Sequence, residues 1–112
     1  MATTTTLLDH RALSADEAIS AADAPDLGDG QTLEIVVTVH EVAEGDSPML
    51  ALLHAPEADG DWLPFEPPVR VPLSRPGRVW IHIPRFTRYV GWQVMGTLDT
   101  SPNVSVKLVA KA

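Results

Sequence analysis

The chain has 112 residues, a formal net charge of -7 and no cysteine. A chain of this length forms one domain, and the absence of cysteine excludes a disulfide framework, a zinc–thiolate site and a thiol nucleophile. The acidic total argues against general binding to nucleic acid, which requires a basic surface.

The sequence shows no sign of a membrane segment or a signal peptide. No apolar run approaches the ~20 residues that a membrane helix needs. Residues 1–6 lack the basic and apolar regions of a secretory signal. We therefore expect a soluble protein that is made in the cytoplasm and has no membrane partner.

Charge is divided unevenly along the chain. Residues 1–66 contain 14 acidic residues and one basic residue, whereas residues 67–112 contain one acidic residue and seven basic residues. Two interpretations remain open. Strands from the two halves interleave so that their charges partly neutralise one another, or the molecule is dipolar and docks its basic end on an acidic partner.

The amino terminus combines a polar tail with an apolar pair. Residues 1–6 are rich in threonine, and we expect them to be mobile. Leu7 and Leu8 follow directly. Such a pair either anchors the tail on the core of its own domain or reaches a neighbouring subunit, and both uses need the same residues.

The next segment carries two conflicting signals. Ser14 and Glu17 match a capping box, which predicts a short helix over residues 15–24. Only three residues of that helix could form a buried stripe, and a helix this short is marginal without packing. We favour extended structure, followed by a loop over residues 24–30 that is rich in turn-forming residues.

Strand-like alternation dominates the rest of the chain. The strongest signal is residues 33–42, where apolar side chains occupy the odd positions from 33 to 39. Shorter strands, separated by turn residues, are predicted over residues 49–54, 69–73, 78–83, 89–95 and 104–109. Pro67 and Pro68 cannot donate to a ladder, so the segment around them is a sheet edge or an irregular connection.

These elements predict an all-β domain. Seven or eight antiparallel strands, with turns roughly every eight to twelve residues, are typical of a β-sandwich or a jelly roll. We expect residues 1–30 to form an extended amino-terminal arm and the first strand region, and residues 31–112 to form the sandwich.

Most of the arginines are gathered in one part of the chain. Five of the six lie within 19 residues: Arg70, Arg75, Arg78, Arg85 and Arg88. Arginine is favoured at interfaces because its planar fork makes two hydrogen bonds to a carboxylate. These residues form either a docking surface or a solvated face that meets the acidic half. Trp62 follows an acidic turn, and its position fits exposure at an interface as well as burial.

Residues 76–96 carry a resemblance to a known family. The pattern consists of Ile81, Ile83, Pro84, Arg85, Thr87, Arg88, Tyr89 and Val90. It resembles the corner before the penultimate strand in phage capsid cement proteins, typified by the Bordetella phage cement protein. Leu7 and Leu8, the loop at residues 26–28 and the strand at residues 33–39 are similar to the amino-terminal half of that family.

The resemblance implies a jelly roll that acts as a capsid cement or decoration protein. Such a protein binds the major capsid protein on the exterior of the virion, as a dimer or trimer, and needs neither catalysis nor a cofactor. It stabilises the shell by mass action, because it binds only the assembled state. The residues we expect at partner contacts are Leu7, Leu8, Trp62, Arg75, Arg78, Arg85 and Arg88.

Two other functions are considered. A carbohydrate-binding β-sandwich module would need a pair of exposed coplanar aromatic rings, for which Trp62 and Trp80 are candidates, and burial of Trp80 and Trp92 would count against it. A small cupin-like enzyme would need His40 and His82 together on the inner surface with a third ligand.

No metal site or catalytic motif is predicted. Residues 59–61 start like a calcium loop, but Arg70 occupies the twelfth position, where an EF-hand has glutamate. The sequence also lacks a Gly-x-Ser-x-Gly nucleophile elbow. We therefore expect a binding protein and not an enzyme.

Overall fold

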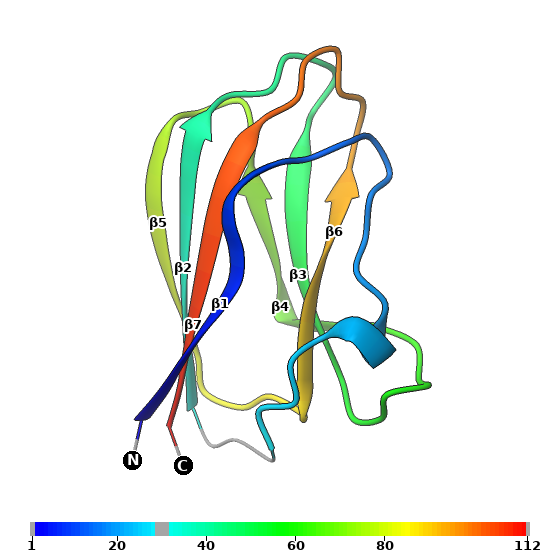
Figure 1. Cartoon of the computed structure of the whole chain (residues 1–112), viewed down its shortest axis with the longest axis vertical. Coiled ribbons are helices and arrows are strands. Elements are labelled where there is room, and N and C mark those ends of the chain that lie inside the picture. The colour runs from blue at the N-terminus through cyan, green and yellow to red at the C-terminus, as the bar shows by residue number, and fades with distance from the viewer. Residues whose placement is uncertain (1, 29–31, 112) are drawn as a thin grey trace.

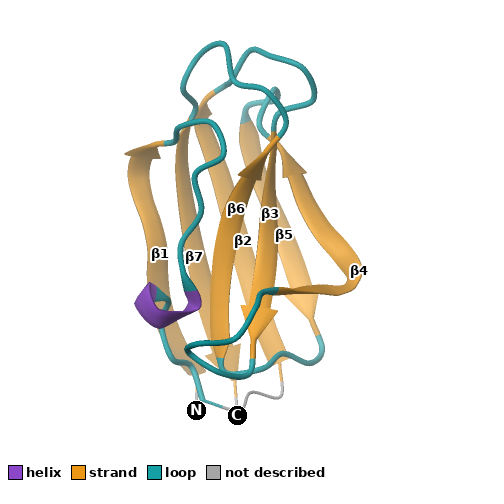
Figure 2. Ribbon diagram, turned by 90° about the vertical axis from the view of Figure 1, so that its right-hand side faces the viewer, coloured by secondary structure: helices purple, strands orange, loops and turns teal. Residues whose placement is uncertain are grey.

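The computed structural model describes residues 2–28 and 32–111 as an all-β sandwich (Figure 1). The described elements are β1 (Ala2–Ala12), the 3-10 helix η1 (Ala21–Asp23), β2 (Thr32–Glu41), β3 (Met49–Ala55), β4 (Leu63–Pro72), β5 (Gly77–Ile83), β6 (Tyr89–Met95) and β7 (Asn103–Lys111). One sheet has the order β1-β7-β2-β5, the other has the order β4-β3-β6, and all pairs are antiparallel (Figure 2). The predicted β-sandwich is confirmed.

Residues 17–27 run along the free edge of β6. The amide of Ile19 donates to the carbonyl of Trp92 at 3.2 Å, and the amide of Val94 donates to the carbonyl of Glu17 at 2.8 Å. Further along, two isolated bridges join Ala18 to Gln93 and Asp26 to Tyr89. We call residues 17–27 the covering segment. Counted as an irregular strand, it completes the two four-stranded sheets of a jelly roll.

The core lies between the two sheets. Every odd position of β2 from 33 to 39 points inward and is buried, as the alternation predicts. Trp92 of β6 is 1% exposed and is among the largest fully buried side chains, so it fills the space that the smaller side chains of β2 and β7 leave. Because the core uses one face of each strand, the opposite faces of the sheets are left for other contacts.

The amino-terminal residues do not form the mobile tail that we predicted. Residues 3–6 pair with residues 107–110 of β7 as part of β1. Threonine is β-branched and suits a strand, and β7 offers it an unpaired ladder. Leu8 is only 3% exposed and Leu7 packs against the core, so within the described residues this pair anchors β1 on its own domain.

The extended structure that we favoured for residues 15–24 is limited to an isolated bridge at Ala18, which lies between a turn at residues 15–16 and η1. Half of the capping box forms, because the Glu17 carboxylate accepts a hydrogen bond from the Ser14 amide at 3.0 Å. No α-helix follows. Asp16 has a φ of 58°, which turns the chain toward β6, where backbone pairing satisfies the amides.

In the described chain, no helix is long and apolar enough to cross a membrane.

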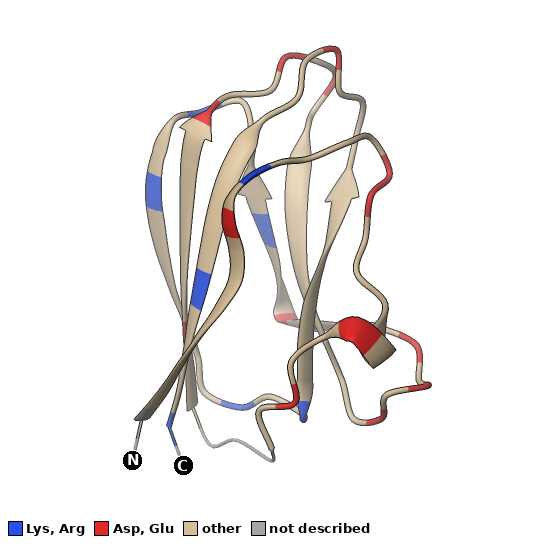
Figure 3. Ribbon diagram, viewed as in Figure 1, with Lys and Arg blue, Asp and Glu red and all other residues tan. Residues whose placement is uncertain are grey.

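Strands of the two halves interleave, as one of the two charge interpretations predicts, because β1 pairs with β7 and β2 pairs with β5 and β7. Docking of a basic end on an acidic partner stays a prediction. In Figure 3, which colours the ribbon by residue type, acidic residues lie around η1, in the β3–β4 connection and in the upper loops, whereas basic residues lie on β4, β5 and β7 and in the lower loop between β5 and β6. An ion pair joins a basic residue of the second half to an acidic residue of the first: Arg88 donates to Asp26 with an Nη2–Oδ2 distance of 2.6 Å. This hydrogen bond, with one from the amide of Gly28, lowers the pKa of the Asp26 carboxyl.

Candidate functional site

The four-stranded sheet turns a face with an unusual mixture of side chains to solvent. We call its side chains that point away from the core the outer face. The strand register places them in three cross-strand rows: Val109, Glu34 and His82; Lys107, Val36 and Trp80; and Ser105, Thr38 and Arg78. Because the register is continuous between β2 and β5, the even positions of these two strands share this face.

Trp80 is the most exposed large apolar side chain of the described residues. Its exposed fraction is 66%, and its indole Nε1 donates to Oε2 of Glu34 at 2.8 Å. The other oxygen of Glu34 accepts from Nδ1 of His82 at 2.6 Å. The bond from His82 and then that from Trp80 lower the pKa of the Glu34 carboxyl. The indole is thus oriented by its edge while much of its surface stays open to solvent.

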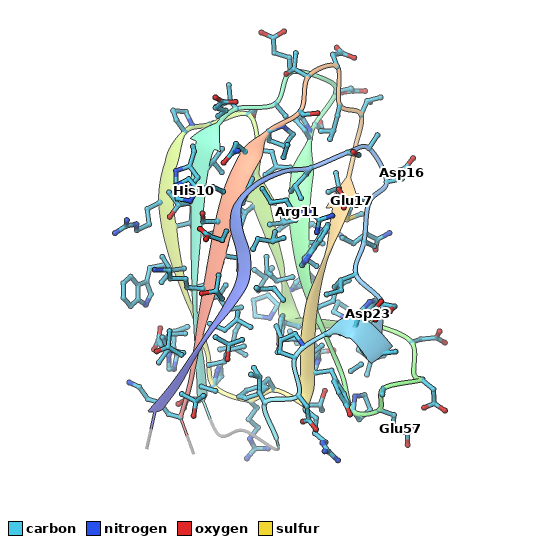
Figure 4. The ribbon with its side chains drawn as sticks, viewed as in Figure 1. His10, Arg11, Asp16, Glu17, Asp23 and Glu57 are labelled. Carbon is cyan, nitrogen blue, oxygen red and sulfur yellow. The ribbon has the colours of Figure 1, made fainter. Side chains whose placement is uncertain are left out.

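A second polar cluster lies where β1 meets this face. His10 has a φ of 45°, in the left-handed region that histidine enters more readily than most residues. Its ring stacks on that of His40, with a centroid distance of 4.0 Å. Both residues bond to Oγ of Ser105, which accepts from the amide of His10 at 2.9 Å and lies 2.8 Å from Nε2 of His40. Figure 4 shows His10 beside the upper part of β2.

A hollow of about 380 Å³ lies on the outer face. Its lining residues come from all four strands: Thr4, Asp9, His10, Val36, Thr38, His40, Arg78, Trp80, Ser105, Lys107 and Val109. The hollow combines an exposed aromatic ring, two cationic side chains and several hydroxyl and imidazole groups. Such a surface can bind a partner through apolar contact and charged hydrogen bonds.

The geometry does not provide the inner histidine cluster of a cupin-like enzyme. His82 lies opposite Glu34, near the end of the β2–β5 ladder that is remote from His40. Both histidines share the outer face with the even positions of β2 from 34 to 38, so neither lines the core. No group of three or more His, Asp or Glu side chains within residues 2–28 and 32–111 is arranged to hold a metal ion.

The predicted arginine cluster is split by β5. Arg75 and Arg78 lie at one end of this strand, whereas Arg85 and Arg88 lie in the loop at the other end. Seven residues of strand span ~23 Å, so the two pairs cannot form one compact patch. Arg78 lines the hollow of the outer face, and Arg85 lines a separate pocket of about 620 Å³ at the end of the sandwich.

Trp62 is held by the covering segment. Its indole Nε1 donates to the carbonyl of Ile19 at 2.8 Å, and its ring lies against Gly91 of β6. The side chain is half-buried, so Trp62 joins the β3–β4 connection to the covering segment. The exposed aromatic pair that a carbohydrate-binding module would need is not complete within the described part of the chain, because Trp80 is exposed but Trp62 is half-buried against Gly91.

Sequence reasoning missed Lys107 and the two stacked histidines of this face. They lie on β1, β2 and β7, whose neighbourhood is created by pairing between the two ends of the chain. The predicted strand at residues 104–109 includes position 107, and in the structure this position faces away from the core. Nothing in the local sequence indicates which residues face the same way beside it.

No protein-family model and no curated protein matches the chain. Among solved structures it is similar to the SPBc2 prophage-derived protein YomS, with a TM-score of 0.57 and 13% identity over 98% of this chain and 92% of that chain. A weaker similarity is to the vertex protein P5 of PRD1, with a TM-score of 0.49 and 12% identity over 97% of this chain and 92% of that chain. Another is to a chain from disulfide-linked pili of Bacillus endospore appendages, with a TM-score of 0.41 and 14% identity over 100% of this chain and 83% of that chain. At 13% identity, the likeness to YomS is one of fold.

Proposed function

We propose that this protein is a structural protein of a phage virion, a cement or decoration protein that binds the outside of the assembled capsid. The observation that carries the proposal is the outer face, where an exposed tryptophan and half-buried valines share one hollow with Arg78 and Lys107. The fold shared with a prophage-derived protein agrees with a phage setting, which is itself part of the proposal.

The outer face has the composition of a protein-binding surface. Tryptophan and arginine supply much of the binding energy at interfaces. The indole ring buries a large apolar area, and the planar guanidinium makes two hydrogen bonds at once to a carboxylate. Val36 and Val109 extend the apolar centre around Trp80. Lys107 and Arg78 would meet carboxylates of the capsid, and a wider rim of threonine and histidine supplies hydrogen bonds.

The mechanism is thermodynamic linkage and requires no catalysis. A ligand that binds the assembled shell and not its free subunits raises the stability of the shell by an amount set by the ligand concentration and the dissociation constant. A capsid offers many equivalent sites, so a modest affinity at each site adds up over the whole lattice. The partner is the major capsid protein, and the protein acts on the exterior of the virion.

The test is co-sedimentation of the purified protein with capsids of its virus that lack it, together with the melting temperature of the shell. Lys107→Glu reverses a charge at the centre of the outer face, whereas Arg85→Glu makes the same change in the pocket at the end of the sandwich. We expect saturable binding and a raised shell melting temperature, both weakened by Lys107→Glu and retained in Arg85→Glu. Absence of binding, or equal loss in both variants, contradicts the proposal.

Carbohydrate binding is the second candidate, because Trp80 offers an exposed ring beside two cationic side chains. A sugar ring could stack on the indole while Arg78 and Lys107 bind an acidic substituent. A glycan array with wild-type protein and Trp80→Ala separates the two candidates. Binding to acidic glycans that needs Trp80, combined with no binding to capsids, favours this second function.

A further inference from the structure

The sandwich has four strand edges, and three of them are protected. Unpaired edges invite pairing with other chains, and proteins block them with covers, prolines or irregularities. The covering segment lies on β6, and the ladder of β1 is broken by register shifts around Leu8. The other edge of the three-stranded sheet is β4, which contains Pro64, Pro67, Pro68 and Pro72.

The fourth edge, β5, has none of these protections. The strand Gly77–Ile83 contains no proline and one charged side chain of the Lys, Arg, Asp or Glu type, Arg78, and its ladder with β2 has no irregularity. Val79 and Trp80, on opposite faces of this strand, are 41% and 66% exposed. In Figure 1, β5 forms the outer margin of its sheet. An uninterrupted apolar edge with exposed side chains on both faces is what pairing with another strand would cover.

The space beside β5 is also open toward the second sheet. A groove of about 330 Å³ lies between β4 and β5. Its floor includes Val69, Val71, Val79, Ile81 and Ile83, while the prolines of β4 form its opposite wall. A strand added to β5 would therefore gain backbone hydrogen bonds on its edge and apolar contact on its inner side.

We propose that β5 pairs in antiparallel fashion with β5 of a second copy, around a two-fold axis at Trp80. Trp80 is the central residue of this seven-residue strand. Residues directly opposite in an antiparallel pair point to the same face, so a symmetric register must be centred on one residue. Centring on Trp80 pairs the whole strand and joins the two four-stranded sheets into one sheet of eight strands.

The side chains of β5 are complementary to themselves in this register. Val79 lies opposite Ile81 of the second copy, so the apolar inner side is continued across the axis. On the outer side, Arg78 lies opposite the second copy's position 82. Within one copy, His82 donates to Glu34 of the neighbouring strand β2. Glu34 is therefore two strand spacings, ~10 Å, from the backbone of Arg78 of the second copy. The strand carries no acid of its own, and Glu34 supplies the opposite charge.

A cysteine trap tests both the pairing and its register, since the chain has no natural cysteine. In the proposed dimer, Trp80→Cys places two thiols directly opposite, with Cα atoms ~4.5–5.5 Å apart, a distance that suits a disulfide. The two Arg78→Cys positions are offset by four residues, ~13 Å along the strand. When Arg78→Cys and His82→Cys proteins are mixed, a dimer of one copy of each variant has the two thiols directly opposite each other.

Under mild oxidation of the free protein, we expect a covalent dimer from Trp80→Cys and from the mixture, and little from Arg78→Cys alone. Leu63→Cys, an exposed apolar position on the proline-containing β4, is the control for random collision. Equal cross-linking of Arg78→Cys and Trp80→Cys overturns the register. No cross-linking of Trp80→Cys above the Leu63→Cys level overturns the dimer.

Sedimentation equilibrium of the unmodified chain completes the test. We expect a reversible dimer that Trp80→Lys weakens by at least about tenfold, because two like charges then face each other across the axis. Leu63→Lys leaves association unchanged. A wild-type protein that stays monomeric at millimolar concentration overturns the proposal. These measurements use no capsid, so their outcome is independent of the proposed capsid binding.

Discussion

The two open sides of the sandwich differ in what closes them. On one side, the covering segment lies along β6, and Arg11 bonds to Glu17 and lies over the ring of Trp92 at 5.3 Å (Figure 4). On the other side, β4 and β5 border an open apolar groove. The difference follows from the connections. The connection from Ala12 to Thr32 is long enough to run along the edge of β6. The turn that joins β4 to β5, residues 73–76, is too short to cover the edge of either strand.

This contrast teaches where stability and where binding reside. The closed side contributes buried contacts to the fold of the single chain. The open side leaves apolar area and unpaired backbone groups available, so its contribution appears only when a partner is present. Substitutions on the closed side should therefore change the unfolding free energy of the monomer, whereas substitutions on the open side should change binding to a partner.

The largest effect on stability is expected at Leu13, on the closed side. Its side chain is fully buried, and its amide donates to the carbonyl of Pro102 at 3.1 Å. Leu13→Ala should lower the free energy of unfolding by ~2–5 kcal/mol, because it leaves a cavity in the core. Urea denaturation measures this, with Val79→Ala on the open side as the matched control. Equal losses in the two variants would show that the sides are not different.

Gly91→Val should have the next largest effect. A β-carbon at position 91 would overlap the ring of Trp62 and approach the side chain of Ile19. The covering segment and Trp62 must then move, at a cost of ~1–3 kcal/mol. Gln93→Val, an exposed position on the same strand, is the control. A Gly91→Val protein with wild-type stability in denaturant would contradict the proposed role of this packing.

A pH-dependent effect is expected at His54, near the loop that joins the two sides. Its Nδ1 accepts from the amide of Thr87 at 3.2 Å, and its ring stacks on Phe65 at 4.5 Å. Burial lowers the pKa of His54 from its usual 6.5, outweighing a backbone hydrogen bond to Pro64 that raises it. Between the lowered folded-state pKa and the unfolded-state value near 6.5, the unfolded chain binds more protons.

The free energy of unfolding should therefore fall as the pH drops through about 6.5, until the folded-state pKa is passed. Unfolding curves from pH 8 to 5 should show a smaller decrease for His54→Gln, which keeps an acceptor but does not titrate. Subtracting the two profiles removes the contribution of the other histidines. A variant whose profile parallels that of the wild type would refute the assignment to His54.

The smallest effect on the monomer is expected at Trp80. Because this side chain is mostly exposed, Trp80→Lys should change the unfolding free energy of the monomer by no more than ~0.5 kcal/mol. The measurement is made at concentrations where wild type is monomeric. A large loss of stability would mean that Trp80 belongs to the fold, and the contrast between the two sides would weaken.

Much of the fold could be predicted from local pattern. Alternation located β2 and identified its buried odd positions. The prolines at positions 67 and 68 predicted either a sheet edge or an irregular connection, and the structure places β4 at an edge. The helix signal at Ser14 and Glu17 was correctly judged weak. The prediction of a mobile tail was wrong for residues 2–6, because it considered only the absence of apolar side chains, while backbone pairing with β7 provides the order. Residue 1 lies outside the described residues.

The sequence alone determined the class of the fold and the face of each strand, because side-chain alternation is a property of the extended backbone itself. Only the tertiary structure decided which faces and edges are left open. Trp80 and Trp92 follow similar strand patterns, yet one is 66% exposed and the other 1%. Their difference depends on which way each strand faces and on which segments cover it, and these are set by pairing between residues distant in the chain.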